Sequence, residues 1–313
     1  MFRVSYCVAR SSRYGCGMLG RFAYVATLMA ISAAKMLAQG PATITFIDTF
    51  ATRPSPLWNN LNGNWAASDG KYYAQTPNDS PLTYTGLPFD IADYRLTVTT
   101  VVGDGGIWLR SDERDPYADY ILLVIGGDGY GQGLRGGNSG TSLYFATQSE
   151  SGINQVDNVF TPGETYTITV TAEGGTYSVY INGATTPVDT FVDTSFVGGQ
   201  VGLYDDQPNT TNGNGSGTPT TFSNFGLTGI ALPPTVTVFS PGGGVVGSAV
   251  KIAGRNLQLA TAVAFNGTPA KFAQAYPSAE IVAIVPDSAT TGQIQVTTPV
   301  GIATSLASFT VLP

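Results

Sequence analysis

An aromatic and a basic side chain stand two residues apart in the segment Gly105-Gly-Ile-Trp108-Leu-Arg110-Ser. Residues two apart on a β-strand project from the same face, so Trp108 and Arg110 are predicted to point one way and Ile107 and Leu109 the other. An aromatic ring can stack on the apolar face of a sugar, and a guanidinium can donate to hydroxyl or carboxylate oxygens. The pair predicts a sugar platform. A Trp108 packed in the core with its N–H bonded is the alternative, and the sequence leaves both open.

Three further side chains on the next strand–loop unit are predicted to line the same surface. They are Tyr120, Tyr130 and Arg135. Together with Trp108 and Arg110 they would give one face two kinds of group, aromatic rings for stacking and guanidinium groups for polar contacts.

Acidic residues gather directly after the Trp108 segment, where the sequence predicts a loop. They are Asp112, Glu113, Asp115 and Asp119. A pair of carboxylates can hydrolyse a glycosidic bond, and carboxylate oxygens can also hold calcium. A solvated loop, a calcium or ligand contact and a catalytic group are the three interpretations that stay open.

Histidine is absent from the chain, which excludes Ser-His-Asp catalysis and zinc sites built on histidine. Oxygen ligands remain. Asp48 lies on the predicted first strand and Asn224 on the predicted last one, and Asp206 opens a polar loop. Hard oxygen ligands from strand ends and a polar loop predict a structural calcium ion held by these three residues. The alternative is that the Gly/Asn/Thr-rich loop is ordinary surface.

The composition indicates a folded, turn-rich β-protein of about two domains: 313 residues, 42% hydrophobic, 11% charged and 39 Gly. Residues 1–38 are predicted to be a secretory signal peptide, because Arg21 precedes a short apolar run that ends in small residues. Translation from Met18 would give a more ordinary signal. An uncleaved anchor is the alternative, and after cleavage no stable membrane insertion is expected.

Both cysteines, Cys7 and Cys16, precede the apolar run, so the mature chain would contain no disulfide and no cysteine nucleophile. The mature chain would carry nine basic residues against 21 acidic ones, a net charge of −12 (9 − 21). Such a surface repels nucleic acid. The predicted location is extracellular, secreted or at the cell surface.

Residues 43–230 show nine strand-like segments, with Gly, Asn and Asp turns between them and no amphipathic helical stretch. Regularly spaced strands of this kind predict a two-sheet sandwich. Alternation assigns the faces on one strand: Ile168 and Val170 are predicted to face the core, and Thr169 with its alternate threonines to face solvent. Trp58 and Trp65 are predicted to pack at the sandwich edge.

Several phrases of this region, in order, resemble the concanavalin A-like lectin/glucanase superfamily, in its laminin G-like and 3-keto-disaccharide hydrolase-like branches. They are Phe46-Ile-Asp48-Thr-Phe50, Gly63-Asn-Trp65, the Trp108 segment, Tyr177-Ser-Val-Tyr-Ile-Asn182-Gly183, Gly199-Gln-Val-Gly202-Leu203-Tyr204 and Phe222-Ser-Asn224-Phe225. The resemblance implies a jelly-roll fold. The glucanases of this superfamily carry a Glu-x-Asp-x-x-Glu phrase, which this sequence lacks.

Residues 233–313 form a second β-region, joined through Pro233-Pro234. Its phrases are Gly254-Arg-Asn256-Leu257, Val263-Ala-Phe265-Asn266-Gly267, Ile284-Val-Pro286 and Thr291-Gly292-Gln-Ile294-Gln-Val296-Thr-Thr-Pro299-Val-Gly301. They resemble the IPT/TIG family of immunoglobulin-like domains, which implies a small β-sandwich that spaces, presents or binds.

The sequence therefore predicts an all-β protein, a jelly-roll β-sandwich followed by a smaller immunoglobulin-like β-sandwich. The favoured function is non-catalytic binding of an extracellular polysaccharide or glycoconjugate on the concave face of the jelly roll, with the second domain as spacer or docking module. Two alternatives stay open: a hydrolase similar to the 3-keto-disaccharide hydrolases, and a purely structural surface or matrix protein. Fold alone does not decide among them.

Overall fold

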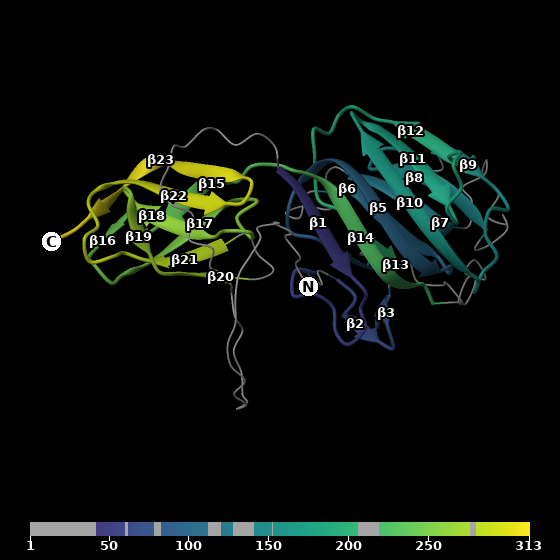
Figure 1. The fold of residues 1–313 in the computed structure, drawn as a ribbon, viewed down its shortest axis with the longest axis horizontal. Coiled ribbons are helices and arrows are strands. Elements are labelled where there is room, and N and C mark those ends of the chain that lie inside the picture. The colour runs from purple at the N-terminus through teal and green to yellow at the C-terminus, as the bar shows by residue number, and fades with distance from the viewer. Residues whose placement is uncertain are drawn as a thin grey trace, which may run out of the picture.

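The computed structural model describes residues 42–59, 62–77, 83–111, 120–127, 141–151, 153–205, 219–275 and 280–313. Within these ranges the chain forms strands and no helix, so the predicted all-β fold class is confirmed. None of the described residues belongs to a helix long and apolar enough to cross a membrane. The predicted signal peptide lies outside the described residues. The strands build two bodies that lie side by side (Figure 1).

The larger body, the first sandwich, combines an eight-stranded and a six-stranded sheet. In the eight-stranded sheet the order is β12-β11-β10-β5-β14-β3-β2, and β1 also pairs with β14. Its strands are β1 (Ala42–Asp48), β2 (Trp65–Ser68), β3 (Lys71–Ala74), β5 (Ile91–Val101), β10 (Thr165–Glu173), β11 (Thr176–Ile181), β12 (Asp189–Val192) and β14 (Thr221–Ala231).

The six-stranded sheet runs in the order β4-β13-β6-β7-β8-β9. Its strands are β4 (Thr83–Gly86), β6 (Gly105–Ser111), β7 (Tyr120–Gly127), β8 (Ser142–Thr147), β9 (Ile153–Val156) and β13 (Gly202–Asp205). All the neighbouring pairs in this sheet are antiparallel.

The core of the first sandwich lies between its two sheets and follows from the alternation of side chains along each strand. On β10, Ile168 and Val170 are buried in this core. Thr169 is on the opposite face, where its hydroxyl lies 3.2 Å from that of Thr97 on β5. The core side predicted for this strand is confirmed, but Thr169 itself is buried, so the prediction that it faces solvent is wrong. Trp58 and Trp65, predicted at the sandwich edge, are also buried members of the core.

The smaller body, the second sandwich, combines a four-stranded and a five-stranded sheet, in the orders β15-β17-β21-β20 and β16-β23-β22-β18-β19. Its strands are β15 (Thr235–Ser240), β16 (Gly243–Gly244), β17 (Ala249–Arg255), β18 (Ala262–Phe265), β19 (Thr268–Ala270), β20 (Phe272–Ala275), β21 (Glu280–Ile284), β22 (Gly292–Thr298) and β23 (Gly301–Val311). A separate core fills it, centred on residues such as Ile252, Phe265 and Ile294. The resemblance to the IPT/TIG family stays a prediction.

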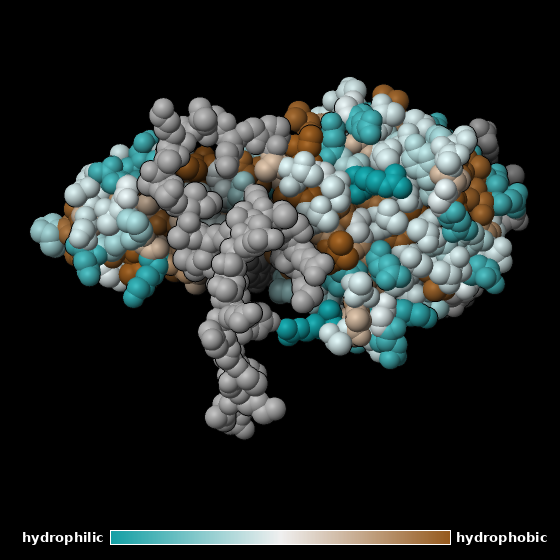
Figure 2. Space-filling model, viewed as in Figure 1, coloured by the Kyte–Doolittle hydropathy of each residue, from teal (hydrophilic) through white to brown (hydrophobic). Residues whose placement is uncertain are grey.

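The two cores are joined through a short connection, because β14 ends at Ala231 and β15 begins at Thr235. In the view of Figure 2, the described surface of the first sandwich is mostly pale or teal, with apolar residues scattered over it. Scattered apolar residues are normal on a protein surface and need no partner to explain them.

Because the cores are separate, a mutation in the second core is expected to act on the second sandwich first. Ile294→Val should lower the free energy of unfolding of that body by about 1 kcal/mol, which corresponds to about 4–8 °C for a domain of this size. The thermal transition followed by far-UV circular dichroism should gain an earlier phase. Tryptophan fluorescence should not follow that phase, because all 3 Trp lie in the first sandwich. An equal shift of both signals would contradict this expectation.

Candidate functional site

An aromatic cluster covers the face of the six-stranded sheet that is turned away from the core. The fully buried Trp108 on β6 lies at its centre. Its ring centroid is 5.5 Å from that of Tyr84 on β4 and 4.8 Å, edge-on, from that of Tyr120 on β7. The other members are Leu122, Val124, Tyr144, Ala146 and Tyr204. Apart from the half-buried Tyr120, these side chains are at most 5% exposed, and we call this buried layer the aromatic face.

Between the rings of the aromatic face, several strand positions are occupied by glycine. Gly86, Gly202 and Trp108 are direct neighbours across β4, β13 and β6. A Cβ atom at Gly202 would lie 2.3 Å from the backbone oxygen of Thr85, and one at Gly106 would lie 2.6 Å from the Tyr204 ring. These positions therefore require glycine, since they bring backbone and rings close together.

Three polar side-chain atoms on this face are buried and have no hydrogen-bond partner among the described residues. They are the Nδ2 of Asn59, the Nε1 of Trp108 and the Oε1 of Gln200. The side chains are 5%, 0% and 4% exposed, respectively. Buried polar atoms are normally bonded, so a group of three beside aromatic rings marks a place where a ligand can bond. We call Asn59, Trp108 and Gln200 the polar trio.

Backbone contacts fix the positions of the two amides. The backbone N–H of Asn59 donates to the oxygen of Gly86 (3.1 Å), and the Asn59 Oδ1 accepts from the Gly86 N–H (2.7 Å). This leaves Nδ2 as the unused donor. Gln200 lies between two residues that face the core, so its own side chain points the other way. Val201 is buried in the core, and a Cβ atom at Gly199 would lie 3.4 Å from the Cδ of the inward-facing Arg110.

The polar trio offers two N–H donors and one carbonyl acceptor, all uncharged. Gly86 and Trp108 are two strand spacings apart, about 10 Å, so one small ligand could reach all three residues. Aromatic surface with a few placed polar groups is the usual make-up of a small-molecule site. The arrangement can bind a ligand that is rich in hydroxyl groups and has apolar faces.

Arg110 does not lie beside Trp108, and the prediction that the two share a face is wrong. Trp108 pairs with Leu122, whereas Arg110 pairs with Ile121, so Leu109 is an extra residue in β6. This β-bulge turns Arg110 to the core side. There its guanidinium carbon lies 4.8 Å from the ring centroid of Tyr94 and 5.5 Å from that of Tyr177.

The buried guanidinium of Arg110 is held by backbone oxygens. Its Nη1 donates to the oxygen of Ile91 (2.9 Å) and its Nη2 to that of Ala92. The Tyr94 hydroxyl donates to the oxygen of Leu109 (2.9 Å), the extra residue of the bulge. Burial raises the pKa of Tyr94, so this phenol stays a donor. Arg110 therefore stabilises the sandwich and is not a ligand contact.

The remaining predicted ligand contacts divide into two groups. Tyr120 lies on the aromatic face, half-buried and in contact with Trp108. Tyr130, Arg135 and the acidic cluster at 112–119 lie outside the described residues. The prediction for these residues stays a prediction.

Asp48, predicted to bind calcium, is occupied by N–H donors. Its Oδ1 accepts from the backbone N–H of Phe50 (2.9 Å), and its Oδ2 accepts from the N–H of Ser55 (2.7 Å) and the indole of Trp58 (2.9 Å). The carboxylate thus fixes the turn after β1 and the Trp58 ring.

Of the other two predicted calcium ligands, Asn224 does not join Asp48. The strands are neighbours as expected, since Asp48 pairs with Phe225, but Asn224 is exposed and has a left-handed backbone (φ 50°) while Asp48 is buried. Asp206 lies outside the described residues. Within the described ranges there is no group of three or more His, Cys, Asp or Glu side chains that could hold a metal. Calcium stays a prediction.

The polar amides and three of the rings, those of Tyr84, Tyr144 and Tyr204, were not predicted from the sequence. Gln200, Gly202 and Tyr204 occupy alternate positions, as do Tyr84 and Gly86, and this period of two was the available signal. The unused donor of Asn59 could not be found in this way, because it depends on a contact with a strand 27 residues later.

Searches with family models and against curated proteins found no match. Solved structures similar to the chain include a carbohydrate binding module, CBM66, from Bacillus subtilis, with 16% identity, covering 56% of this chain and 93% of the module, TM-score 0.37. A Bacillus licheniformis β-glucanase has 11% identity, with coverage of 59% and 97% and a TM-score of 0.39. The Crh5 transglycosylase has 13% identity, with coverage of 63% and 88% and a TM-score of 0.42. At these values the similarities do not indicate a function.

Removal of the buried cation should destabilise the first sandwich. Arg110→Met leaves the oxygens of Ile91 and Ala92 without their donors and should lower the free energy of unfolding by about 2–4 kcal/mol, measured by urea unfolding with tryptophan fluorescence. Arg95→Met, on the exposed face of β5, is the matched control and should change it by less than about 0.5 kcal/mol. An Arg110 variant as stable as the control would show that the guanidinium is not held as described.

Asp48→Asn distinguishes a turn-fixing carboxylate from a metal ligand. The Asp48 carboxylate accepts hydrogen bonds from three N–H groups, whereas an asparagine amide would place an NH2 group against some of these donors. The free energy of unfolding of the variant should therefore fall by about 1–3 kcal/mol in chelator as well as in calcium. The measurement is urea unfolding in both buffers. A loss of stability seen only in calcium would instead make Asp48 a calcium ligand.

Proposed function

We propose that this chain binds carbohydrate without catalysis, and that the ligand contacts the polar trio and the rings of the aromatic face. The observation that carries the proposal is the burial of three unused polar atoms, from Asn59, Trp108 and Gln200, next to a cluster of tyrosines outside the core. The biological ligand would be an extracellular polysaccharide or glycoconjugate, because the leader predicts secretion.

A sugar suits this surface on chemical grounds. It presents apolar C–H faces to aromatic rings and hydroxyl groups that both donate and accept, and the trio supplies two donors and an acceptor. Trp108 is fully covered, so it contributes its indole N–H, and the half-buried Tyr120 contributes ring surface. Because the trio is buried, a ligand reaches it only after a local rearrangement, and side-chain rearrangements are common on binding.

The described strands of this face favour binding over hydrolysis. Glycoside hydrolysis generally uses two carboxylates on either side of the bond. Among the described residues of the six-stranded sheet, the one carboxylate is that of Asp205, which pairs with Gly105. Both face inward, since a Cβ at Gly105 would contact Thr220, the residue before β14. The hydrolase alternative therefore depends on the acidic cluster at 112–119.

Glycan binding is tested by a glycan array followed by titration calorimetry of the best ligand, with and without calcium. Gln200→Met removes the acceptor at nearly equal volume, and Asn59→Asp keeps the oxygen that bonds Gly86 while replacing the donor. Each should weaken binding by about 10-fold, the value of a buried hydrogen bond.

Thr167→Val, on the outer face of the opposite sheet, is the matched control and should bind as the wild type does. If the wild type binds no glycan, or if binding survives both site variants unchanged, the proposal is wrong. Release of reducing sugar from the bound glycan would favour the hydrolase instead.

A further inference from the structure

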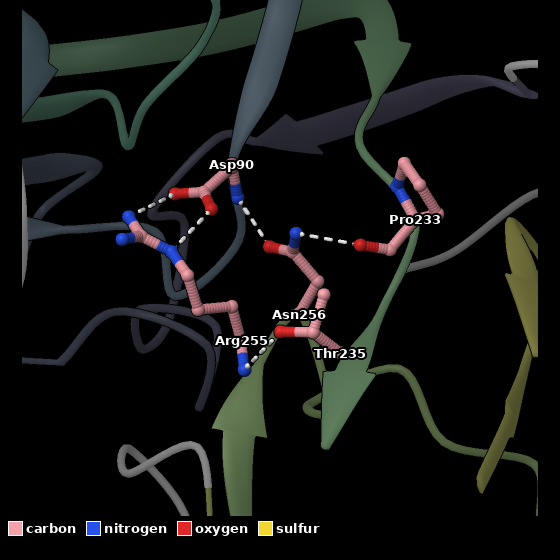
Figure 3. Close-up of polar contacts among 5 residues, drawn as sticks. All are labelled: Asp90, Pro233, Thr235, Arg255 and Asn256. Atoms are coloured by element: carbon pink, nitrogen blue, oxygen red, sulfur yellow. Dashed lines mark hydrogen bonds and ion pairs between the residues drawn. The ribbon is translucent and has the colours of Figure 1, made fainter. Parts of the chain in front are cut away.

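Residues of the second sandwich bind Asp90, an acidic residue of the first sandwich that lies directly before β5 (Figure 3). The Asp90 carboxylate accepts from the Nε of Arg255 (2.9 Å) and from its Nη2 (3.3 Å). The Asp90 side chain is 7% exposed and that of Arg255 38%. Two donors on one planar group fix orientation as well as distance, unlike a single surface ion pair.

Asn256, the next residue, completes the joint from the same turn of the second sandwich. Its Oδ1 accepts from the backbone N–H of Asp90 (2.7 Å), and its Nδ2 donates to the oxygen of Pro233 in the connection (3.1 Å) (Figure 3). One side chain thus binds the first sandwich and the connection together. A left-handed backbone at Asn256 (φ 57°) aims it there.

A continuous series of hydrogen bonds runs from this joint to the polar trio. Ile91, the residue after Asp90, exchanges backbone hydrogen bonds with Gly199 (3.0 and 3.2 Å). Gly199 precedes Gln200, whose backbone exchanges two bonds of 3.1 Å with Ser111 at the end of β6. Gln200, which carries the acceptor of the trio, therefore directly follows Gly199, the residue that is hydrogen-bonded to the neighbour of Asp90.

The same segment also holds the bulge beside Trp108. The oxygens of Ile91 and Ala92 accept from the Arg110 guanidinium. Arg110 turns inward at the bulge that directly follows Trp108. Two members of the trio, Trp108 and Gln200, are thus supported by the short segment from Asp90 to Ala92.

We propose that Arg255 and Asn256 are positioning residues for the ligand site, so that the second sandwich regulates glycan binding on the first. The inference rests on the proposed carbohydrate function. Linkage makes the effect reciprocal: a joint that favours the binding geometry is itself stabilised by the ligand. The second sandwich then acts as more than a spacer.

Amide hydrogen exchange tests the coupling without a ligand. Arg255→Met removes the two donors, and Asn256→Gly removes the amide while allowing the left-handed backbone. Each should speed exchange of the amides of Ser111 and Gln200 by about fivefold or more, because local opening near the site becomes easier. Lys251→Met is the matched control: it lies on the same strand and breaks an exposed ion pair with Glu280, so it should change neither amide.

The affinity for the glycan found on the array gives the second readout. Arg255→Met and Asn256→Gly should weaken it by about fivefold, with Lys251→Met unchanged. In the double-mutant cycle of Arg255→Met with Asp90→Asn, the second change should add little, since both remove one interaction.

The outcomes separate the two proposals. Unchanged exchange at Ser111 and Gln200 in both joint variants would overturn the coupling, and so would unchanged affinity in variants whose joint is broken, while Gln200→Met would still weaken binding if the site is correct. A wild type that binds no glycan overturns the carbohydrate site and the regulation of it. In that case the exchange result alone decides whether the joint supports this face.

Discussion

The guanidinium of Arg110 is buried in the first sandwich and needs hydrogen-bond acceptors there. The position of those acceptors is linked to the bulge in β6, to the outward orientation of Trp108 and to the joint with the second sandwich. A buried cation is stable only when its donors are used. Arg110 meets this need at Nη1 and Nη2 with the oxygens of Ile91 and Ala92, and its plane lies near the rings of Tyr94 and Tyr177 in the opposite sheet, while its Nε has no partner among the described residues. The bulge in β6 turns the side chain inward and leaves Trp108 facing outward.

Because the bulge turns Arg110 inward, the outer face of the six-stranded sheet carries aromatic rings and uncharged polar groups around Trp108. Trp108 is surrounded by tyrosines over glycine positions, and the amides of Asn59 and Gln200 carry polar atoms that no described residue uses. The segment that anchors Arg110 begins at Asp90, which the second sandwich holds through Arg255 and Asn256. One short stretch of backbone thus supports the core, the candidate site and the joint.

Period-two alternation predicted the long strands and the core side of β10, because a half-buried strand displays this pattern in its sequence. Five of the six four-residue strands of the first sandwich, β2, β3, β4, β9 and β12, were missed, since four residues rarely show a clear period, whereas the equally short β13 was predicted. The alternation rule failed at Arg110, because an inserted residue such as Leu109 leaves no mark in the sequence and reverses the face of the residue after it. The metal role of Asp48 was predicted from residue type, whereas the structure gives its oxygens to N–H donors from the next ten residues.

The indole N–H signals in a proton–nitrogen NMR spectrum test the central claim most directly. The chain has 3 Trp, and two of the indoles have partners: Trp58 donates to Asp48 (2.9 Å) and Trp65 to the oxygen of Asn62 (2.8 Å). If the glycan binds at the polar trio, its titration should shift the Trp108 indole signal saturably and leave the other two in place. Saturable glycan binding that leaves the Trp108 signal unmoved would contradict the account, because the ligand would then lie elsewhere on the molecule.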